Sequence, residues 1–141
     1  MKKKNMIMNL TSFADDEEIL KLISVAKLWK NGERIFLEWE GDTLDGSCEK
    51  TYLSVKGSRQ VMIAYSDPGS PVLVLEDGKK CFSVQPSPLP FLPSDSVGYA
   101  TNYIRNTLTP AGGRLTFEYV ADYRMNKYRR KVDIRISEYR Q

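Results

Sequence analysis

The last third of the chain alternates apolar and polar residues with a period of two, and this feature constrains the fold more than any other. In the segment 114–121 the apolar positions are Leu115, Phe117 and Tyr119. In the segment 130–137 they are Val132, Ile134 and Ile136. A β-strand with one buried face and one solvated face has this period. The two segments therefore predict a pair of antiparallel strands, as found in sandwiches and barrels, and they name no reaction.

Earlier segments repeat the pattern at intervals of about 8 to 14 residues, each bounded by turn residues. A charged N-terminus leads into a first strand at Met6-Ile7-Met8, and further candidate strands are 35–39, 51–55, 61–65, 72–75, 81–84 and 97–104. Asn31-Gly32 precedes one of them and is a strong hairpin signal because both residues tolerate positive φ. Short turns between neighbouring strands predict an up-and-down meander.

The segment from Asp15 to Asn31 carries the local signals of a helix instead. Acidic residues fill its first turn, Lys27 and Lys30 lie in its last turn, and Gly32 follows its end. Its apolar residues Leu22, Val25, Ala26 and Trp29 would share one helical face. Local propensity therefore predicts a helix here.

A proline-rich segment, 86–93, separates the candidate strands at 81–84 and 97–104. Its four prolines exclude regular structure and predict an extended segment. The segment could be a polyproline ligand for a partner, a lid that packs Leu89, Phe91 and Leu92 over one end of a barrel, or a plain loop.

Composition limits the chemistry that the chain can perform. At 141 residues, with a net charge of +3, we expect one soluble domain spanning 1–141. The chain has no histidine, which excludes Ser-His-Asp and Cys-His constellations and the common zinc sites. Its two cysteines, Cys48 and Cys81, form no Cys-x-x-Cys motif and are interpreted as free thiols. We therefore predict that the protein is not an enzyme and uses no cofactor.

The N-terminus only partly imitates a signal peptide. Three lysines precede a short apolar stretch that is interrupted by Asn5 and Asn9. No apolar run approaches the ~20 residues that a membrane-spanning helix requires. The sequence therefore predicts a cytoplasmic protein without a membrane partner.

Several stretches together resemble the YwiB-like family, which consists of bacterial domains of unknown function with a calycin-like β-barrel. The resemblance runs from about Glu17 to Glu138, and the matching stretches are 26–32, 37–40, 76–80, 106–108 and 112–119. It implies an all-β fold, a single calycin-like (lipocalin-like) antiparallel barrel of eight to ten strands. It also implies that Glu17 to Lys30 is a strand, and we adopt this prediction against the local helix signals.

The chain departs from the family pattern at two places. Members tend to carry Arg and then Gly where this chain has Tyr65 and Asp67. They also carry a Tyr-x-Thr-Pro-Tyr-Gly stretch where this chain has the proline-rich segment 86–93. No functional residue is carried over from the family for this reason.

A small barrel either fills its interior with side chains or leaves room for one small ligand. We predict the second, with an apolar or amphipathic ligand lined by Trp39, Tyr65 and Tyr119 and gated by Phe91 and Leu92. The other inward candidates are Leu37, Ile63, Phe117, Ile134 and Ile136. A filled core is the competing interpretation, and a buried Trp or Tyr would then find its hydrogen-bond partner in the backbone.

A basic stretch near the end of the chain gives an alternative function of another class. Tyr123 and Tyr128 are interleaved with the basic residues Arg124, Lys127, Arg129, Arg130 and Lys131. Cations with aromatics are typical of nucleic-acid surfaces, so an RNA or protein interaction module is the alternative hypothesis. Basic residues that protect an edge strand would give the same composition.

Acidic residues give no metal or catalytic prediction. The run of four acids from Asp15 to Glu18 does not match a calcium-binding loop, and we predict no metal site. Glu38 and Glu40 share a strand face, but the glycines that follow favour a solvated segment over paired acid–base carboxylates.

Overall fold

The computed structural model describes residues 2–42, 48–65, 71–83, 97–123 and 126–139. Within these ranges the secondary structure is entirely β, with ten strands. Their bounds are β1 Lys4–Ala14, β2 Glu17–Asn31, β3 Arg34–Asp42, β4 Cys48–Lys56, β5 Gln60–Tyr65, β6 Pro71–Glu76, β7 Lys80–Ser83, β8 Val97–Asn106, β9 Gly113–Tyr123 and β10 Asn126–Glu138. The all-β prediction is confirmed.

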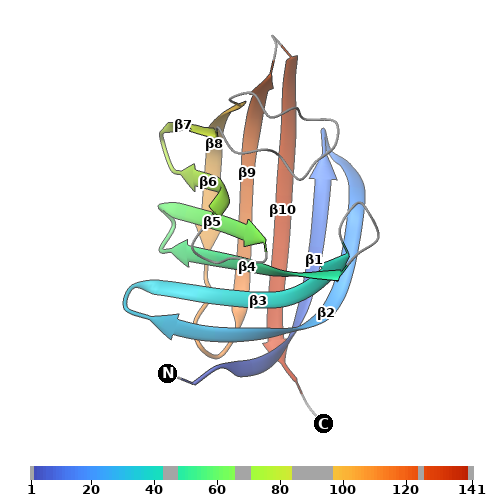
Figure 1. Ribbon diagram of the computed structural model, residues 1–141, viewed down its shortest axis with the longest axis vertical. Helices are drawn as coiled ribbons and strands as arrows, with labels where there is room; N and C mark the ends of the chain where they lie inside the picture. Colours follow the sequence, from blue (N-terminus) through green and yellow to red (C-terminus); the bar gives the residue numbers. More distant parts are fainter. Residues whose placement is uncertain (1, 43–47, 66–70, 84–96, 124–125, 140–141) are drawn as a thin grey trace.

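All ten strands form one antiparallel sheet in the order β6-β5-β4-β3-β2-β1-β10-β9-β8-β7. Every sequential pair except β6 and β7 is hydrogen-bonded, and β1 with β10 joins the two halves. Strands β6 and β7 contact each other at the two edges of the sheet, so the barrel is nearly closed. Figure 1 shows β8, β9, β10 and β1 running steeply behind β3, β4 and β5, with the long curved β2 linking the two layers. The predicted up-and-down meander is confirmed, and the architecture is calycin-like.

Successive connections alternate between the two ends of the barrel. One end, here called the short-turn end, carries the β2–β3, β4–β5, β6–β7 and β8–β9 turns. Gly32, Gly57 and Gly78 adopt positive φ in the first three of these turns. The side-chain amide of Asn106 donates a hydrogen bond to the carbonyl oxygen of Gly57 at 2.9 Å, which links β8 to the β4–β5 turn across this end.

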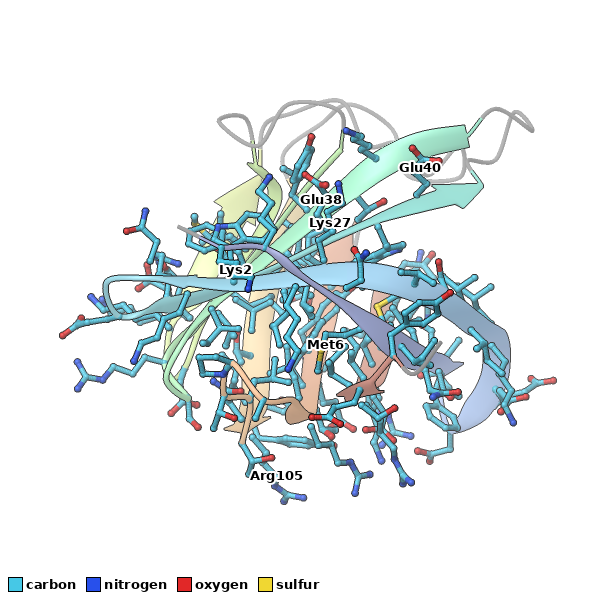
Figure 2. The ribbon with its side chains drawn as sticks, turned by 90° about the horizontal axis from the view of Figure 1, so that it is seen from below. Lys2, Met6, Lys27, Glu38, Glu40 and Arg105 are labelled. Atoms are coloured by element: carbon cyan, nitrogen blue, oxygen red, sulfur yellow. The ribbon has the colours of Figure 1, made fainter. Side chains whose placement is uncertain are left out.

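The most completely buried side chains belong to the short-turn half of the interior. Met6, Met8, Leu28, Leu37, Leu53, Val55, Val61, Leu75, Leu115, Phe117 and Ile134 are essentially inaccessible to solvent. They come from β1 through β6 and from β9 and β10, so the two layers share one core. Figure 2 looks from below, with Met6 at the centre between the strands, whereas Arg105 points away from the barrel.

The segment 17–31 is a strand, as the family resemblance implied, and the local helix signals were misleading. Cross-strand pairing explains the outcome, since Leu22 lies opposite Leu10 and Ala26 opposite Met6, both inside the barrel. Val25 and Trp29 fall on the outer face, where Trp29 stacks on Phe36 with ring centroids 5.3 Å apart. Pairing of β2 with β1 along 17–28 and with β3 along 27–31 therefore outweighs the helical pattern.

Two aspartates make the tight β1–β2 turn at the opposite end, here called the Asp15 end. Asp15 and Asp16 have φ values of 48° and 71°, the left-handed conformation that Asp tolerates better than most residues. Strands β3, β5, β7 and β9 also finish at this end. The predicted proline-rich segment lies outside the described residues.

Candidate functional site

A row of three polar residues crosses the inner face of the barrel towards the Asp15 end. Arg130 of β10 lies opposite Tyr119 of β9, and Tyr119 lies opposite Thr101 of β8. Tyr128 and Val132, two residues to either side of Arg130, both pack against the core. Because alternate residues of a strand share a face, Arg130 stands on the inner face with them. We call Arg130, Tyr119 and Thr101 the polar row.

Arg130 has no acidic partner among the described residues. Its Nη1 donates to the carbonyl oxygen of Arg129 at 3.1 Å, and its guanidinium carbon lies 5.8 Å from the centre of the Tyr128 ring. Two described acids fall in the inward phase near this part of the sheet, and neither contacts Arg130: Glu138 lies at the far end of β10 beside Lys4 at 4.0 Å, and exposed Glu17 of β2 is separated from Arg130 by Ala14. A guanidinium carries five N–H donors, so most of those of Arg130 remain available for a ligand.

Thr101 places a buried hydroxyl in the same row. The hydroxyl oxygen is shielded from solvent and has no hydrogen-bond partner in the described part of the chain. Such a group costs about 1–3 kcal/mol when nothing satisfies it. A bulge between Thr101 and Tyr103 shifts the register of β8 at this point. Bulges commonly re-aim side chains near functional sites.

Aromatic rings surround the polar row. The Tyr99 and Tyr119 rings meet edge to face at 5.8 Å, and Phe117 stacks on Tyr119 at 6.4 Å. Burial raises the pKa of the Tyr99 hydroxyl above its ordinary value, so this phenol stays neutral at physiological pH. The row therefore combines one cation with neutral hydroxyl groups beside an apolar wall.

Along β1, β2 and β10 inward side chains become more accessible towards the Asp15 end, whereas inward Tyr99 of β8 and Ala121 of β9 stay buried there. On β1 and β10 the residues Met8 and Ile134 are buried, whereas Ser12, Val132 and Arg130 are partly exposed. Leu20, which pairs with inward Ser12, is 51% exposed. The inner surface is thus accessible beside Arg130, on the side of β1 and β2.

The predicted ligand-lining residues are only partly described. Trp39 is inward on β3, paired with Thr51, and 8% exposed within the core. Tyr119 is inward and belongs to the polar row. Tyr65 ends β5, and its side chain lies outside the described part of the molecule, as do Phe91 and Leu92 and the side chains of both cysteines. The inward assignments of Leu37, Ile63, Phe117, Ile134 and Ile136 are confirmed, since all pack in or against the core.

The basic stretch does not form one continuous surface. Alternation along β10 turns Arg130 inward and leaves Lys127, Arg129 and Lys131 on the outer face. Arg129 pairs with Asp16 at 2.5 Å, and this contact raises the pKa of Arg129. The ammonium of Lys131 lies 5.5 Å from the centre of the Phe13 ring. Arg124 lies outside the described residues.

Three cations converge instead around a shallow depression on the outer face of β8, β9 and β10. Arg105, Thr107, Arg114, Thr116 and Lys131 line its volume of about 160 Å³. Arg114 contacts Asp133 twice, through Nε at 2.8 Å and Nη2 at 3.1 Å, and the Thr116 hydroxyl donates to Asp133 at 3.0 Å. Burial alone would raise the pKa of Asp133, but these hydrogen bonds outweigh it and hold the pKa below the ordinary value.

Other charged groups have structural roles. Glu38 was expected to be solvated, yet it is buried on the outer face of β3, 3.6 Å from the ammonium of Lys3. Figure 2 shows Glu38 beside its cross-strand partner Lys27. Among the described residues no cluster of three or more Cys, Asp or Glu could hold a metal ion. The described ranges also include no helix long and apolar enough to cross a membrane.

Comparison with known proteins identifies the fold. A search of solved structures finds the crystal structure of the ywiB protein from Bacillus subtilis, with a TM-score of 0.62 and 11% identity over 94% of this chain and 92% of that chain. The chain has a YwiB-like fold. No family model matches the sequence, and no curated protein matches it.

The YwiB-like fold confirms the architecture that the sequence resemblance implied, including the strand at 17–31. At 11% identity the likeness concerns the fold alone. Sequence reasoning placed Tyr119 at the site but assigned Arg130 to an outer basic surface and did not consider Thr101. The period of two in β10 was the available signal for Arg130, because Arg130 falls in phase with Val132 and Ile134.

Proposed function

We propose that this barrel binds one small amphipathic molecule at the Asp15 end of its interior. The observation that carries the proposal is the polar row, in which Arg130 forms no ion pair and the buried hydroxyl of Thr101 has no hydrogen-bond partner among the described residues. Buried polar groups in native proteins are nearly always satisfied, so the Thr101 hydroxyl calls for an explanation, and a ligand is the one that we propose.

The neighbouring wall suits the apolar part of such a ligand. Leu22, Ile63 and Leu73 are partly buried and pack against the core, and Trp39 lies on the same inner surface. Ligand sites commonly combine an apolar lining with a few fixed polar groups. The polar row supplies those groups from three adjacent strands.

Binding without catalysis is part of the proposal. The chain has no histidine, and a general base is needed to activate a hydroxyl nucleophile such as that of Thr101. Glu17, the carboxylate in line with the row, lies on β2, and β1, β10 and β9 separate it from Thr101 on β8.

Tryptophan fluorescence tests the proposal because the two tryptophans lie on opposite faces of the sheet. The Trp29→Phe variant retains only inward Trp39, and Trp39→Phe retains only outward Trp29. Titration with decan-1-ol, decanoate and decyltrimethylammonium should give a saturable change with at least one probe in the first variant and none in the second. Equal changes in both variants, or none in either, would refute binding inside the barrel.

An RNA interaction module remains the second candidate. It is supported by the outward Lys127 and Lys131 and by the cationic depression that Arg105 and Arg114 share with Lys131. If three of these cations met phosphates, the logarithm of the binding constant would fall with the logarithm of salt concentration at a slope of about 2. Filter binding of single-stranded RNA between low and moderate salt measures this slope, and salt-independent binding would exclude the candidate.

A further inference from the structure

We propose that the ligand of the barrel carries a single oxyanion head group, a carboxylate or a phosphate, that is bound by Arg130 with the hydroxyl of Thr101. This inference rests on the proposed function and adds the chemical class of the ligand. It follows from what the polar row offers, which is hydroxyl groups and one guanidinium that forms no ion pair with a described acid.

The register fixes the relative positions of the three groups. Arg130 and Thr101 lie on either side of Tyr119 along one line across β10, β9 and β8. Neighbouring strands are about 4.8 Å apart, so the Cα atoms of Arg130 and Thr101 are separated by roughly 10 Å. The long side chain of Arg130 and the short one of Thr101 can therefore approach one small group from two sides above Tyr119.

Charge favours an anion over a neutral or cationic head group. An inward arginine is costly unless it is paired, and Arg130 forms no ion pair with a described residue. Exposed Glu17 is separated from Arg130 by Ala14, and Glu138 lies at the opposite end of β10. The nearby acids Asp15 and Asp16 are exposed at the turn, and Asp16 is engaged by Arg129 on the outer face. An oxyanion can accept the paired N–H groups of the guanidinium and also the Thr101 hydroxyl.

Arg130 is the residue that carries the charge of the site, and its neighbours are aromatic. Tyr99 stays protonated because burial raises its pKa, and the ring of Tyr128 lies beside the guanidinium at 5.8 Å without compensating its charge. The apolar neighbours Val132, Phe117 and Ile104 form the next row towards the core. A head group at Arg130 thus leaves an attached apolar chain in contact with apolar side chains.

Matched ten-carbon probes test the inference. Decanoate, decyl phosphate and decan-1-ol share one chain length, so their affinities isolate the head group. We expect at least one of the two anions to bind wild-type protein about tenfold or more tightly than decan-1-ol, as measured by isothermal titration calorimetry below the micellar range. The tighter of the two anions identifies the oxyanion.

Two neighbouring arginines give a matched pair of variants. Arg130→Gln should weaken binding of the preferred anion about 10- to 100-fold and leave decan-1-ol unchanged, because a hydrogen-bonded charge is lost only for the anion. Arg129→Gln removes an equal charge from the outer face and should change neither affinity. Arg130→Lys keeps the charge without the planar fork and should restore part of the loss. Circular dichroism of each variant verifies the fold.

Each other outcome has a definite meaning. Equal affinities for anions and decan-1-ol, or equal losses in the Arg129 and Arg130 variants, would overturn oxyanion recognition and leave the binding barrel intact. If Arg130→Gln does not fold, Thr101→Val provides the same test, with a selective loss of anion affinity expected and no loss contradicting the inference. Binding of none of the three probes would refute both the inference and the proposed function.

Discussion

Thr101 and Arg130 lie on strands that do not pair with each other, yet Tyr119 of the strand between them is the cross-strand partner of both. This relationship aligns a guanidinium, a phenol and a hydroxyl across three adjacent strands of the inner face. Towards the short-turn end the interior is apolar and closely packed, and along β1, β2 and β10 it becomes more accessible towards the Asp15 end. Arg130 therefore lies where the buried core of β10 gives way to partly exposed inward residues.

Removing the Thr101 hydroxyl should not destabilise the ligand-free protein. Thr101→Val deletes a buried group that lacks a partner, so the free energy of unfolding in urea should stay equal or rise by about 1 kcal/mol. Thr116→Val is the matched control, because the Thr116 hydroxyl donates to Asp133 at 3.0 Å and its loss should cost about 1 kcal/mol. A larger loss for Thr101→Val than for Thr116→Val would show that the hydroxyl has a structural partner.

The two tryptophans should differ in their contribution to stability. Trp39→Ala removes a large inward side chain that is 8% exposed, and the expected loss is about 3–5 kcal/mol. Trp29→Ala removes an outer ring that stacks on Phe36 and lies 4.4 Å from the ammonium of Lys3, and the expected loss is about 1 kcal/mol. Chemical denaturation measures both. A loss below about 1 kcal/mol for Trp39→Ala would contradict its place in the core.

Gly113 should tolerate substitution much less than Gly57, although both have positive φ. A Cβ at Gly113, with φ of 133°, would collide with the backbone carbonyl of Thr107, and the expected loss for Gly113→Ala is about 3 kcal/mol or more. At Gly57 the φ is 53° and no atom lies within 4 Å of the position that a methyl group would take, so Gly57→Ala should cost only about 1 kcal/mol. Similar melting temperatures for the two variants would be inconsistent with this β8–β9 turn.

Asp133 should make stability depend on acid pH. Its pKa in the folded protein lies below the ordinary value of 3.8, so its contribution is fully present above the unfolded pKa and is lost as pH falls through the folded pKa. Asp133→Asn should therefore lower the free energy of unfolding by about 1 kcal/mol at pH 7. The difference in free energy of unfolding between this variant and wild type should become smaller below about pH 4. If the difference in free energy of unfolding stays constant from pH 7 to pH 2, the charge of Asp133 does not cause the loss of stability in the variant.

Alternation explains why much of the architecture was predictable. In β9 from Leu115 to Tyr119 and in β10 from Val132 to Ile136, inward apolar or aromatic residues alternate with outward polar residues, because the two strands pair with each other without a register shift. Glycine turns at Gly32 and Gly78 marked strand ends correctly. The final strand begins at Asn126, four residues before the predicted start at Arg130, since pairing with β9 extends it.

Two features depended on tertiary pairing and were not predictable from local pattern. In β2 the apolar residues follow a helical spacing, and only pairing with β1 and β3 separates inward Ala26 from outward Val25. In β8 the bulge after Thr101 reverses the phase, so Ile104 rather than Tyr103 faces the core. The partnerless hydroxyl of Thr101 could not be recognised before this shift was known.

Native mass spectrometry of the protein, purified gently without detergent, tests the central claim most directly. The account predicts a reproducible extra mass of one small amphipathic molecule per chain, which denaturation releases and Arg130→Gln reduces. A bare polypeptide mass, unchanged after incubation with decanoate, decyl phosphate or decan-1-ol, would contradict a ligand-binding barrel.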